Sequence, residues 1–227
     1  MKSVKICVGR ADEDGVRPCV DPMSWPCVSL SGVQLGLPGA SRGALDLVGV
    51  LPGGPRLAIV GSRAARRHVL RAIGPIVEAA GRRGWSVVSG GALGVDGGAH
   101  RAALERGVPQ LVVLPCGRDQ LYPPGHTGLF CAALDSGCAG VLFAQPPGTA
   151  TNREMFASRN AIVVGLADAV LVAQASLRSG SRGTGQLGLR SGVAVGVLSG
   201  SAGCGALIGE GARALGEAPR DADAGQL

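Results

Sequence analysis

The stretch Leu57–Arg63 reads LAIVGSR, and a second stretch, Ser89–His100, reads SGGALGVDGGAH. In each case a short apolar segment runs directly into glycines, and a segment of helical length follows. This order points the N-terminus of a helix, with its free backbone N–H groups, at an anion that is usually a phosphate. Arg63 adds a fixed positive charge beside the first glycine. The two stretches therefore predict a phosphate-binding site built from strand ends and helix starts.

Beyond residue 55, apolar segments of strand length alternate with segments of helical length. The predicted strands are Leu57–Val60, Ser86–Val88, Gln110–Leu114, Gly140–Phe143, Ala169–Ala173 and Val193–Leu198. The predicted helices are Ala64–Arg83, Val95–Arg106, His126–Ser136, Arg153–Leu166, Thr184–Arg190 and Ala206–Leu215. Apolar strands separated by helices are typical of a parallel sheet covered on both faces, and right-handed crossovers make it doubly wound. The predicted class is α/β, with a doubly wound, mainly parallel, Rossmann-like sheet whose ligand lies beyond the carboxyl ends of its strands.

The chain has 227 residues, enough for one α/β domain with an extension. Residues 1–52 are rich in proline and glycine and predict an irregular N-terminal extension. Short strands are expected there at Val4–Val8 and around Leu45–Leu51, with a loop between them. Residues 53–216 form the predicted Rossmann-like domain, and the acidic residues 217–227 are expected to be a disordered tail.

The charge of the chain favours a polyanionic partner. Twenty-two lysines and arginines against 16 acidic residues give a formal net charge of +6, and arginines gather between Arg56 and Arg118. Aromatic residues are only 3% of the chain, which favours contacts to a nucleic-acid backbone over extensive base stacking. No apolar run has the length of a membrane span, and the N-terminus is too short and polar for a signal peptide, so a cytoplasmic protein is expected.

The seven cysteines and three histidines do not suggest a metal site. No pair of cysteines has the Cys-x-x-Cys spacing of a zinc ribbon or a redox site. Free, mostly buried thiols are the expected state, and no metal or cofactor is expected.

Three further motifs follow or precede predicted strands. Arg118 provides a charge after the third strand, and nearby Tyr122 either stacks on a base or anchors its loop. Arg159 and Asn160 lie in the helix before the fifth strand. The segment Ser179–Thr184, SGSRGT, follows that strand and suits a second phosphate-binding turn.

Asp96 and His100 stand one turn apart at the start of a predicted helix. Asp96 is read first as the cap of that helix. Because positions i and i+4 share a helix face, a hydrogen bond between the two side chains is also expected.

Together these segments resemble the DprA/Smf family, the bacterial DNA-processing proteins of natural transformation and competence. The resemblance covers roughly residues 55–215 and rests on VGSR at 60–63, SGGALGVDGGAH at 89–100, CGRDQLYP at 116–123, PPGT at 146–149, FASRN at 156–160, and SGS with a threonine at 179–184. It implies a non-catalytic protein that binds single-stranded DNA in a basic groove, loads the RecA recombinase onto it, and forms a homodimer through its Rossmann-like domains. The motifs and the resemblance assign nucleic-acid binding to Gly61, Ser62, Arg63, Ser89, Gly90, Gly91, Gly94, Arg118, Arg159, Asn160, Ser179, Gly180, Ser181 and Thr184.

The chain departs from the family pattern at several positions. Ala161 replaces a third residue of the Arg-Asn-Arg segment, and Gln174 stands where the family usually carries a glutamate. The alternative function is that of a small-nucleotide sensor of the same superfamily. Its phosphoribohydrolases, which resemble the LOG enzymes, need a glutamate at the position that Leu187 occupies here, so no enzyme activity of that type is expected.

Overall fold

The computed structural model describes residues 22–32, 34–35, 37, 45–149 and 151–217. The strand expected at Val4–Val8 and the tail expected after residue 217 lie outside the described residues.

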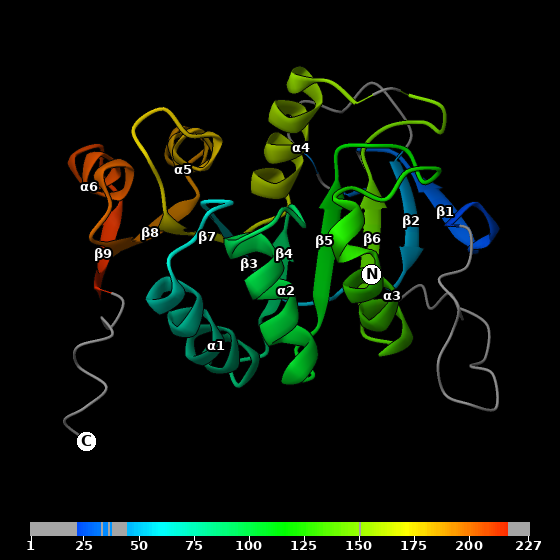
Figure 1. The fold of residues 1–227 in the computed structure, drawn as a ribbon, viewed down its shortest axis with the longest axis horizontal. Coiled ribbons are helices and arrows are strands. Elements are labelled where there is room, and N and C mark those ends of the chain that lie inside the picture. The colour runs from blue at the N-terminus through cyan, green and yellow to red at the C-terminus, as the bar shows by residue number, and fades with distance from the viewer. Residues whose placement is uncertain (1–21, 33, 36, 38–44, 150, 218–227) are drawn as a thin grey trace.

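The described residues form a nine-stranded sheet in the order β1-β2-β6-β5-β4-β3-β7-β8-β9 (Figure 1). The strands are β1 (Cys27–Leu30), β2 (Leu45–Gly49), β3 (Arg56–Gly61), β4 (Ser86–Ser89), β5 (Gln110–Leu114), β6 (Ala139–Phe143), β7 (Ala169–Gln174), β8 (Ala194–Ser199) and β9 (Arg213–Glu217). Strands β3 to β9 pair in parallel, whereas β2 pairs antiparallel with both β1 and β6. This confirms the doubly wound, mainly parallel Rossmann-like sheet.

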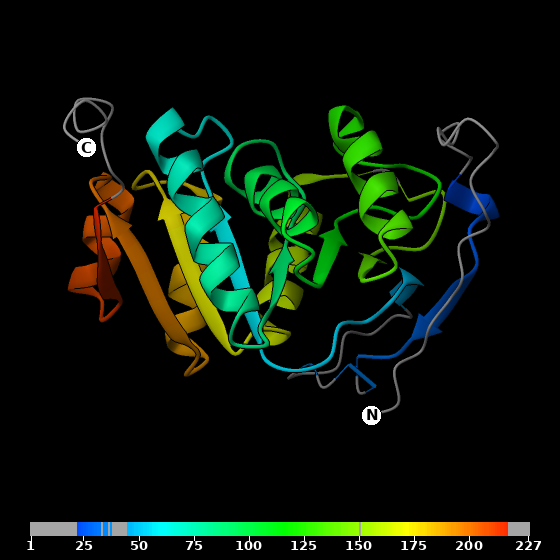
Figure 2. The ribbon, with the colours of Figure 1, turned by 90° about the horizontal axis from the view of Figure 1, so that it is seen from below.

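Helices cover both faces of the sheet, in two groups of three. One face carries α1 (Arg67–Gly81), α2 (Val95–Glu105) and α3 (Thr127–Asp135), and the other carries α4 (Arg153–Gly165), α5 (Gly180–Arg190) and α6 (Ala202–Gly209). Figure 2 shows α1, α2 and α3 in front of the sheet. Alternation along β3 explains the two layers, because Leu57 and Ile59 pack toward α1 and α2 while Ala58 and Val60 pack toward the opposite helices. Short 3-10 turns occur at Pro22–Ser24 and Pro124–His126.

The strand order reverses direction at β3. The chain adds β4, β5 and β6 on one side of β3, then returns to add β7, β8 and β9 on the other side. The loops after β3 and β7 therefore diverge, which opens a crevice at the carboxyl ends of these two strands.

Two predictions about secondary structure are wrong. The middle of the N-terminal segment, expected to be a loop, contains β1, which pairs with β2, whereas the strand expected around Leu45–Leu51 is confirmed as β2. The last expected helix, Ala206–Leu215, is also wrong, because α6 ends at Gly209 and Arg213–Glu217 forms β9. Gly211, at φ +108°, ends the helical path, and β8 offers a parallel edge that pairs Gly196 with Arg213.

Helix α5 begins four residues before the predicted Thr184. Three glycines in its first six residues lower its helix propensity, which hid this start in the sequence. Ser179 makes the start possible, because its side-chain oxygen accepts from the backbone N–H of Arg182 at 3.3 Å.

No helix within the described residues is long and apolar enough to cross a membrane. The five cysteines in the described part of the chain are free thiols. The same part holds no cluster of three or more histidine, cysteine, aspartate or glutamate residues that could bind a metal ion.

Candidate anion-binding site

A cleft of about 270 Å³ lies where the strand order reverses. Its walls are the loops after β3 and β7, the middle of α4 and the first turn of α5. Most of the residues assigned to nucleic-acid binding meet there: Gly61, Ser62, Arg63, Arg159, Asn160, Ser179, Gly180, Ser181 and Thr184. Segments more than 100 residues apart in sequence thus form one site, as the fold predicts for strand ends at a switch point.

Arg63 presents the exposed positive charge of this cleft. Its guanidinium carbon lies 5.2 Å from the centre of the Phe156 ring, within cation–π range. The Phe156 ring packs edge-to-face against Tyr122, with 5.4 Å between ring centres. Tyr122 therefore anchors another ring rather than standing free. No role could be predicted for Phe156 from the sequence, since a single phenylalanine inside a helix does not show which way it faces.

The first turn of α5 supplies backbone donors. Gly180 and Ser181 line the cleft, and the first N–H groups of a helix have no partner within that helix. No acidic residue lies in this first turn, so nothing on the helix itself competes with an external anion. Thr184 is buried and donates to the Gly180 carbonyl at 3.0 Å. The turn is suited to bind a phosphate.

Gln174, at the end of β7, holds the loop after β3 in place. Its backbone carbonyl accepts from the Ser62 N–H at 2.8 Å, and its side-chain oxygen accepts from the Arg66 N–H at 3.0 Å. A neutral amide at this position leaves the positive charge of Arg63 unopposed from this side.

Arg159 and Asp96 are two buried charged residues that line the cleft. Arg159 is only 4% exposed and donates to the carbonyls of Gly90 and Val113 and to the side chain of Asn160. Burial lowers the pKa of Arg159, and the charge of Asp96 opposes that shift. Arg159 was expected to bind nucleic acid. It lines the cleft, but its Nε and one terminal nitrogen donate to protein oxygens, so it contributes charge and support to the cleft.

Asp96 ties the two glycine loops together. Burial raises the pKa of its carboxyl group, while the charge of Arg159 and hydrogen bonds from the N–H groups of Ala92 and Gly61 act in the opposite direction. Asp96 does not cap α2, since Gly94 occupies the cap position. The carboxyl group instead spans the loop after β3 and the loop after β4.

His100 does not pair with Asp96 as expected. Its Nδ1 lies 2.8 Å from the Oε1 of Gln110, the first residue of β5. The two side chains share a helix face but sit at different depths, because Asp96 reaches the loops above the sheet and His100 reaches the start of a strand. Burial lowers the pKa of His100 to about 4.

We expect this histidine to make the fold sensitive to acid. The unfolded chain takes up a proton near pH 6.5 and the folded chain only near pH 4, so stability falls as the pH drops between these values. Between these pH values the free energy of unfolding should fall by about 3 kcal/mol less when His100 is replaced by glutamine. Urea unfolding of the unaltered protein and of the variant, at about pH 7.5 and about pH 4.5, measures this difference. Equal losses in the two proteins would contradict the burial of a neutral histidine.

Ala92 and Asp96 of the second glycine segment line the cleft, but the four residues of that segment predicted to bind nucleic acid, Ser89, Gly90, Gly91 and Gly94, do not. Ser89 is fully buried, with its hydroxyl 2.5 Å from the Ile59 carbonyl. Gly90 leaves room for the Arg159 guanidinium, and Gly91, at φ +67°, packs against Phe130. The loop expected to contact phosphate therefore supports the first glycine loop from below.

Arg118 also lies away from the cleft. Its guanidinium donates to the backbone carbonyls of Met23 and Trp25 at 3.0 and 3.3 Å and lies 3.8 Å from the Asp46 carboxylate. These contacts attach the segment before β1 to the loop after β5. The sequence could not predict the contacts with Met23 and Trp25, because these partners lie more than 90 residues earlier, in a segment without a clear pattern.

Fold and cleft together define a Rossmann-like protein whose switch-point cleft has the charge and backbone donors that suit an anion. The family described as DNA recombination-mediator protein A matches residues 43–222, and the chain belongs to that family. This confirms the resemblance to the DprA/Smf proteins.

Two curated relatives show how much of the length of a family member this chain covers. The chain is 38% identical to a DNA processing protein DprA of Mycobacterium tuberculosis over 162 residues, covering 68% of this chain and 41% of the relative. It is 33% identical to the DNA processing protein DprA of Streptococcus pneumoniae over 178 residues, covering 76% of this chain and 61% of the relative. The chain thus spans between two fifths and three fifths of the length of these relatives.

Solved structures agree with the fold. The X-ray structure of DprA from S. pneumoniae superposes with a TM-score of 0.73 at 28% identity, covering 87% of this chain and 73% of that one. A second structure, of DNA processing protein A from Helicobacter pylori, describes the single-stranded DNA binding mode of that protein. It superposes with a TM-score of 0.74 at 24% identity, covering 85% of this chain and 92% of that one. At that identity the second likeness speaks for the fold alone.

Proposed function

We propose that this chain binds single-stranded DNA in the switch-point cleft and acts in DNA processing during recombination. The observation that carries the proposal is the convergence of the exposed Arg63, the Phe156 ring and the first turn of α5 on one cleft. Guanidinium and helix N–H groups bind phosphates, and an aromatic ring beside them suits a base. Membership of a recombination-mediator family supports the same function.

The proposal includes the RecA recombinase as the protein partner and a homodimer as the working form. RecA as the partner is supported by the family, because a recombination mediator acts on a recombinase. The homodimer is supported by β9, whose five residues are exposed at one end of the sheet, since a strand edge favours pairing with another chain. Natural transformation in the cytoplasm is the setting that the family suggests.

The proposed role involves no catalysis. Asp96 is the carboxylate that lines the cleft within the described residues. It is buried and already accepts from the N–H groups of Gly61 and Ala92, so it is poorly placed to act as a general base. Binding alone is sufficient for a mediator.

A small nucleotide is the competing ligand. The cleft volume of about 270 Å³ lies below the roughly 300–1,000 Å³ of sites that enclose a small molecule. This favours a segment of a longer strand that enters the cleft and continues beyond it.

Fluorescence anisotropy with labelled oligothymidylate and a duplex of equal length, over a series of salt concentrations, tests the function. We expect binding that prefers the single strand and weakens with salt, by a slope of about 0.7 per phosphate contact. Absence of binding at low salt would refute the proposal and leave a small-nucleotide or protein ligand for this fold.

Replacing Arg63 by alanine should weaken single-strand binding several-fold and reduce the salt slope by about 0.7, because one phosphate contact is lost. Arg83→Ala is the matched control, since Arg83 is also exposed but lies beyond α1, outside the cleft. An unchanged affinity of a folded Arg63→Ala protein would remove Arg63 from the site.

A further inference from the structure

The loop between β7 and α5, residues 175–179, forms the wall of the cleft that leads into the first turn of α5. Ser176 and Ser179 line the cleft, so the position of this loop sets where the first N–H groups of α5 point. Apolar packing does not hold the middle of the loop, because Leu177 is 55% exposed and Arg178 is exposed beside it. Polar contacts must therefore fix it.

Arg182, in the first turn of α5, supplies such a contact. It belongs to the SGSRGT motif, yet it does not line the cleft. Its guanidinium donates to the Leu177 carbonyl at 2.9 Å and also contacts the Glu210 carboxylate. The Arg182 side chain is 23% exposed, and its Nε is buried. Arg182 therefore turns away from the cleft and back onto the loop.

Glu210 holds the other side of this guanidinium. It occupies the cap position at the C-terminal end of α6, and its Oε2 accepts from the Gln186 side chain at 3.0 Å. The hydrogen bonds from Arg182 and Gln186 lower the pKa of the Glu210 carboxyl group, which favours its charged form. A carboxylate is unfavourable at the C-terminus of a helix. Its contact with α5 therefore explains Glu210 better than any benefit to α6.

Helix α6 also holds the start of the same loop. The Ser201 hydroxyl, at the N-terminal cap of α6, accepts from the Ala175 N–H at 3.2 Å. The Ala175 carbonyl accepts from the Gly203 N–H at 2.9 Å. The other end of α6 reaches the loop through Glu210 and Arg182. The helix thus fixes the loop at two points.

We propose that Arg182 and Glu210 are positioning residues for the cleft. Together they hold the loop after β7, and with it the first turn of α5, where the helix N–H groups bind a phosphate of single-stranded DNA. Arg182 itself does not touch the DNA. This inference rests on the proposed function. If Glu210 instead withheld Arg182 from phosphate, neutralising Glu210 would have the opposite effect on binding.

The double variant Arg182→Gln/Glu210→Gln tests the inference, because it breaks the contact without changing the net charge. We expect it to bind labelled oligothymidylate about fivefold more weakly, since the loop must then be ordered on binding. Titration well above the Kd gives the active fraction, so that unfolded protein does not lower the affinity measured. The salt slope should be unchanged, whereas loss of a direct phosphate contact would lower it by about 0.7. An oligomer of abasic sites, which keeps the phosphates, should lose affinity by the same factor.

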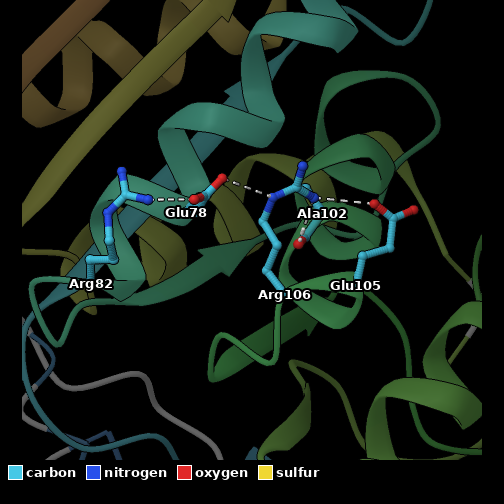
Figure 3. A network of polar contacts seen from close by, with 5 residues as sticks. All are labelled: Glu78, Arg82, Ala102, Glu105 and Arg106. Carbon is cyan, nitrogen blue, oxygen red and sulfur yellow. Dashed lines mark hydrogen bonds and ion pairs between the residues drawn. The ribbon is translucent and has the colours of Figure 1, made fainter.

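A second contact between arginine and glutamate supplies the matched control. Glu78 contacts Arg82 at the end of α1 and lies 3.8 Å from Arg106 at the end of α2, as Figure 3 shows. None of these three residues lines the cleft. Glu78→Gln/Arg82→Gln removes an ion pair of the same kind at constant net charge and should bind DNA as the unaltered protein does.

Glu210→Gln alone gives the sign of the effect, and no gain in affinity is expected. Tighter binding with a slope steeper by about 0.7 would mean that Glu210 withholds Arg182 from phosphate. That result would overturn the inference while the cleft function stands. The same holds for full affinity or a lowered salt slope in the double variant, for a smaller loss with the abasic oligomer, and for an equal loss in the control. Failure of the unaltered protein to bind would refute the cleft function and the inference with it.

Discussion

Gly94→Val should destabilise the protein by about 4 kcal/mol or more and abolish single-strand binding by the fraction that still folds. Gly94 has φ +80° and ψ −124°, a region that side chains avoid. Its missing Cβ atom would lie 2.2 Å from the Ser62 carbonyl oxygen and 2.5 Å from that of Arg63. Since both neighbours are backbone atoms, the loop that carries Arg63 must move. Urea unfolding and anisotropy titration measure the two effects.

Gly107→Val separates strain from overlap. Gly107 has φ +62°, but nothing lies within 4 Å of the Cβ position, so only backbone strain of about 1–3 kcal/mol is expected. DNA binding by this control should be unchanged. A folded Gly94→Val protein with normal binding would show that the second glycine loop does not set the position of the first.

Arg159→Leu should cost about 3–5 kcal/mol of stability, because it leaves Asp96 as a buried charge without its counter-charge. It also leaves the carbonyls of Gly90 and Val113 without the donors that Arg159 provides. The effect is measured as the free energy of unfolding in urea. Arg153→Leu, on the exposed first turn of the same helix, should change that free energy by about 0.5 kcal/mol or less.

A double-mutant cycle with Asp96→Asn tests the cause. In the Arg159→Leu protein, Asp96→Asn should lower the free energy of unfolding by less than it does in the unaltered protein, because it then removes an unpaired buried carboxylate. Additive effects, within about 0.5 kcal/mol, would mean that the two charges do not interact. The large cost of Arg159→Leu would then come from the two carbonyls alone.

The parallel sheet was predictable because its strands are buried on both faces. The segment Gln110–Leu114 is a run of apolar residues after a single glutamine, and β5 has these bounds. β1 and β9 were not predictable in this way. Both are short strands at the ends of the sheet, and each exists because a neighbouring strand offers hydrogen bonds, not because its own residues show a period.

The cleft was predictable in part because the strands that lead into it are recognisable as apolar segments. Glycines after apolar strands lie at the carboxyl edge of a parallel sheet, so Gly61, Ser62 and Ser179 could be placed together from sequence. Whether an arginine there is exposed depends on what surrounds it. Arg63 faces the cleft, while Arg159 points beneath it into buried carbonyls, and both follow a serine in the sequence.

The sequence by itself determined the α/β class, the order of most strands and helices, and the family, because periodicity, glycine position and motif order are local properties of the chain. Tertiary structure alone decided which charges are free to bind. Asp96, His100 and Arg159 were turned inward by the packing of helices on the sheet, and the long-range hydrogen bonds that satisfy them leave no local signal.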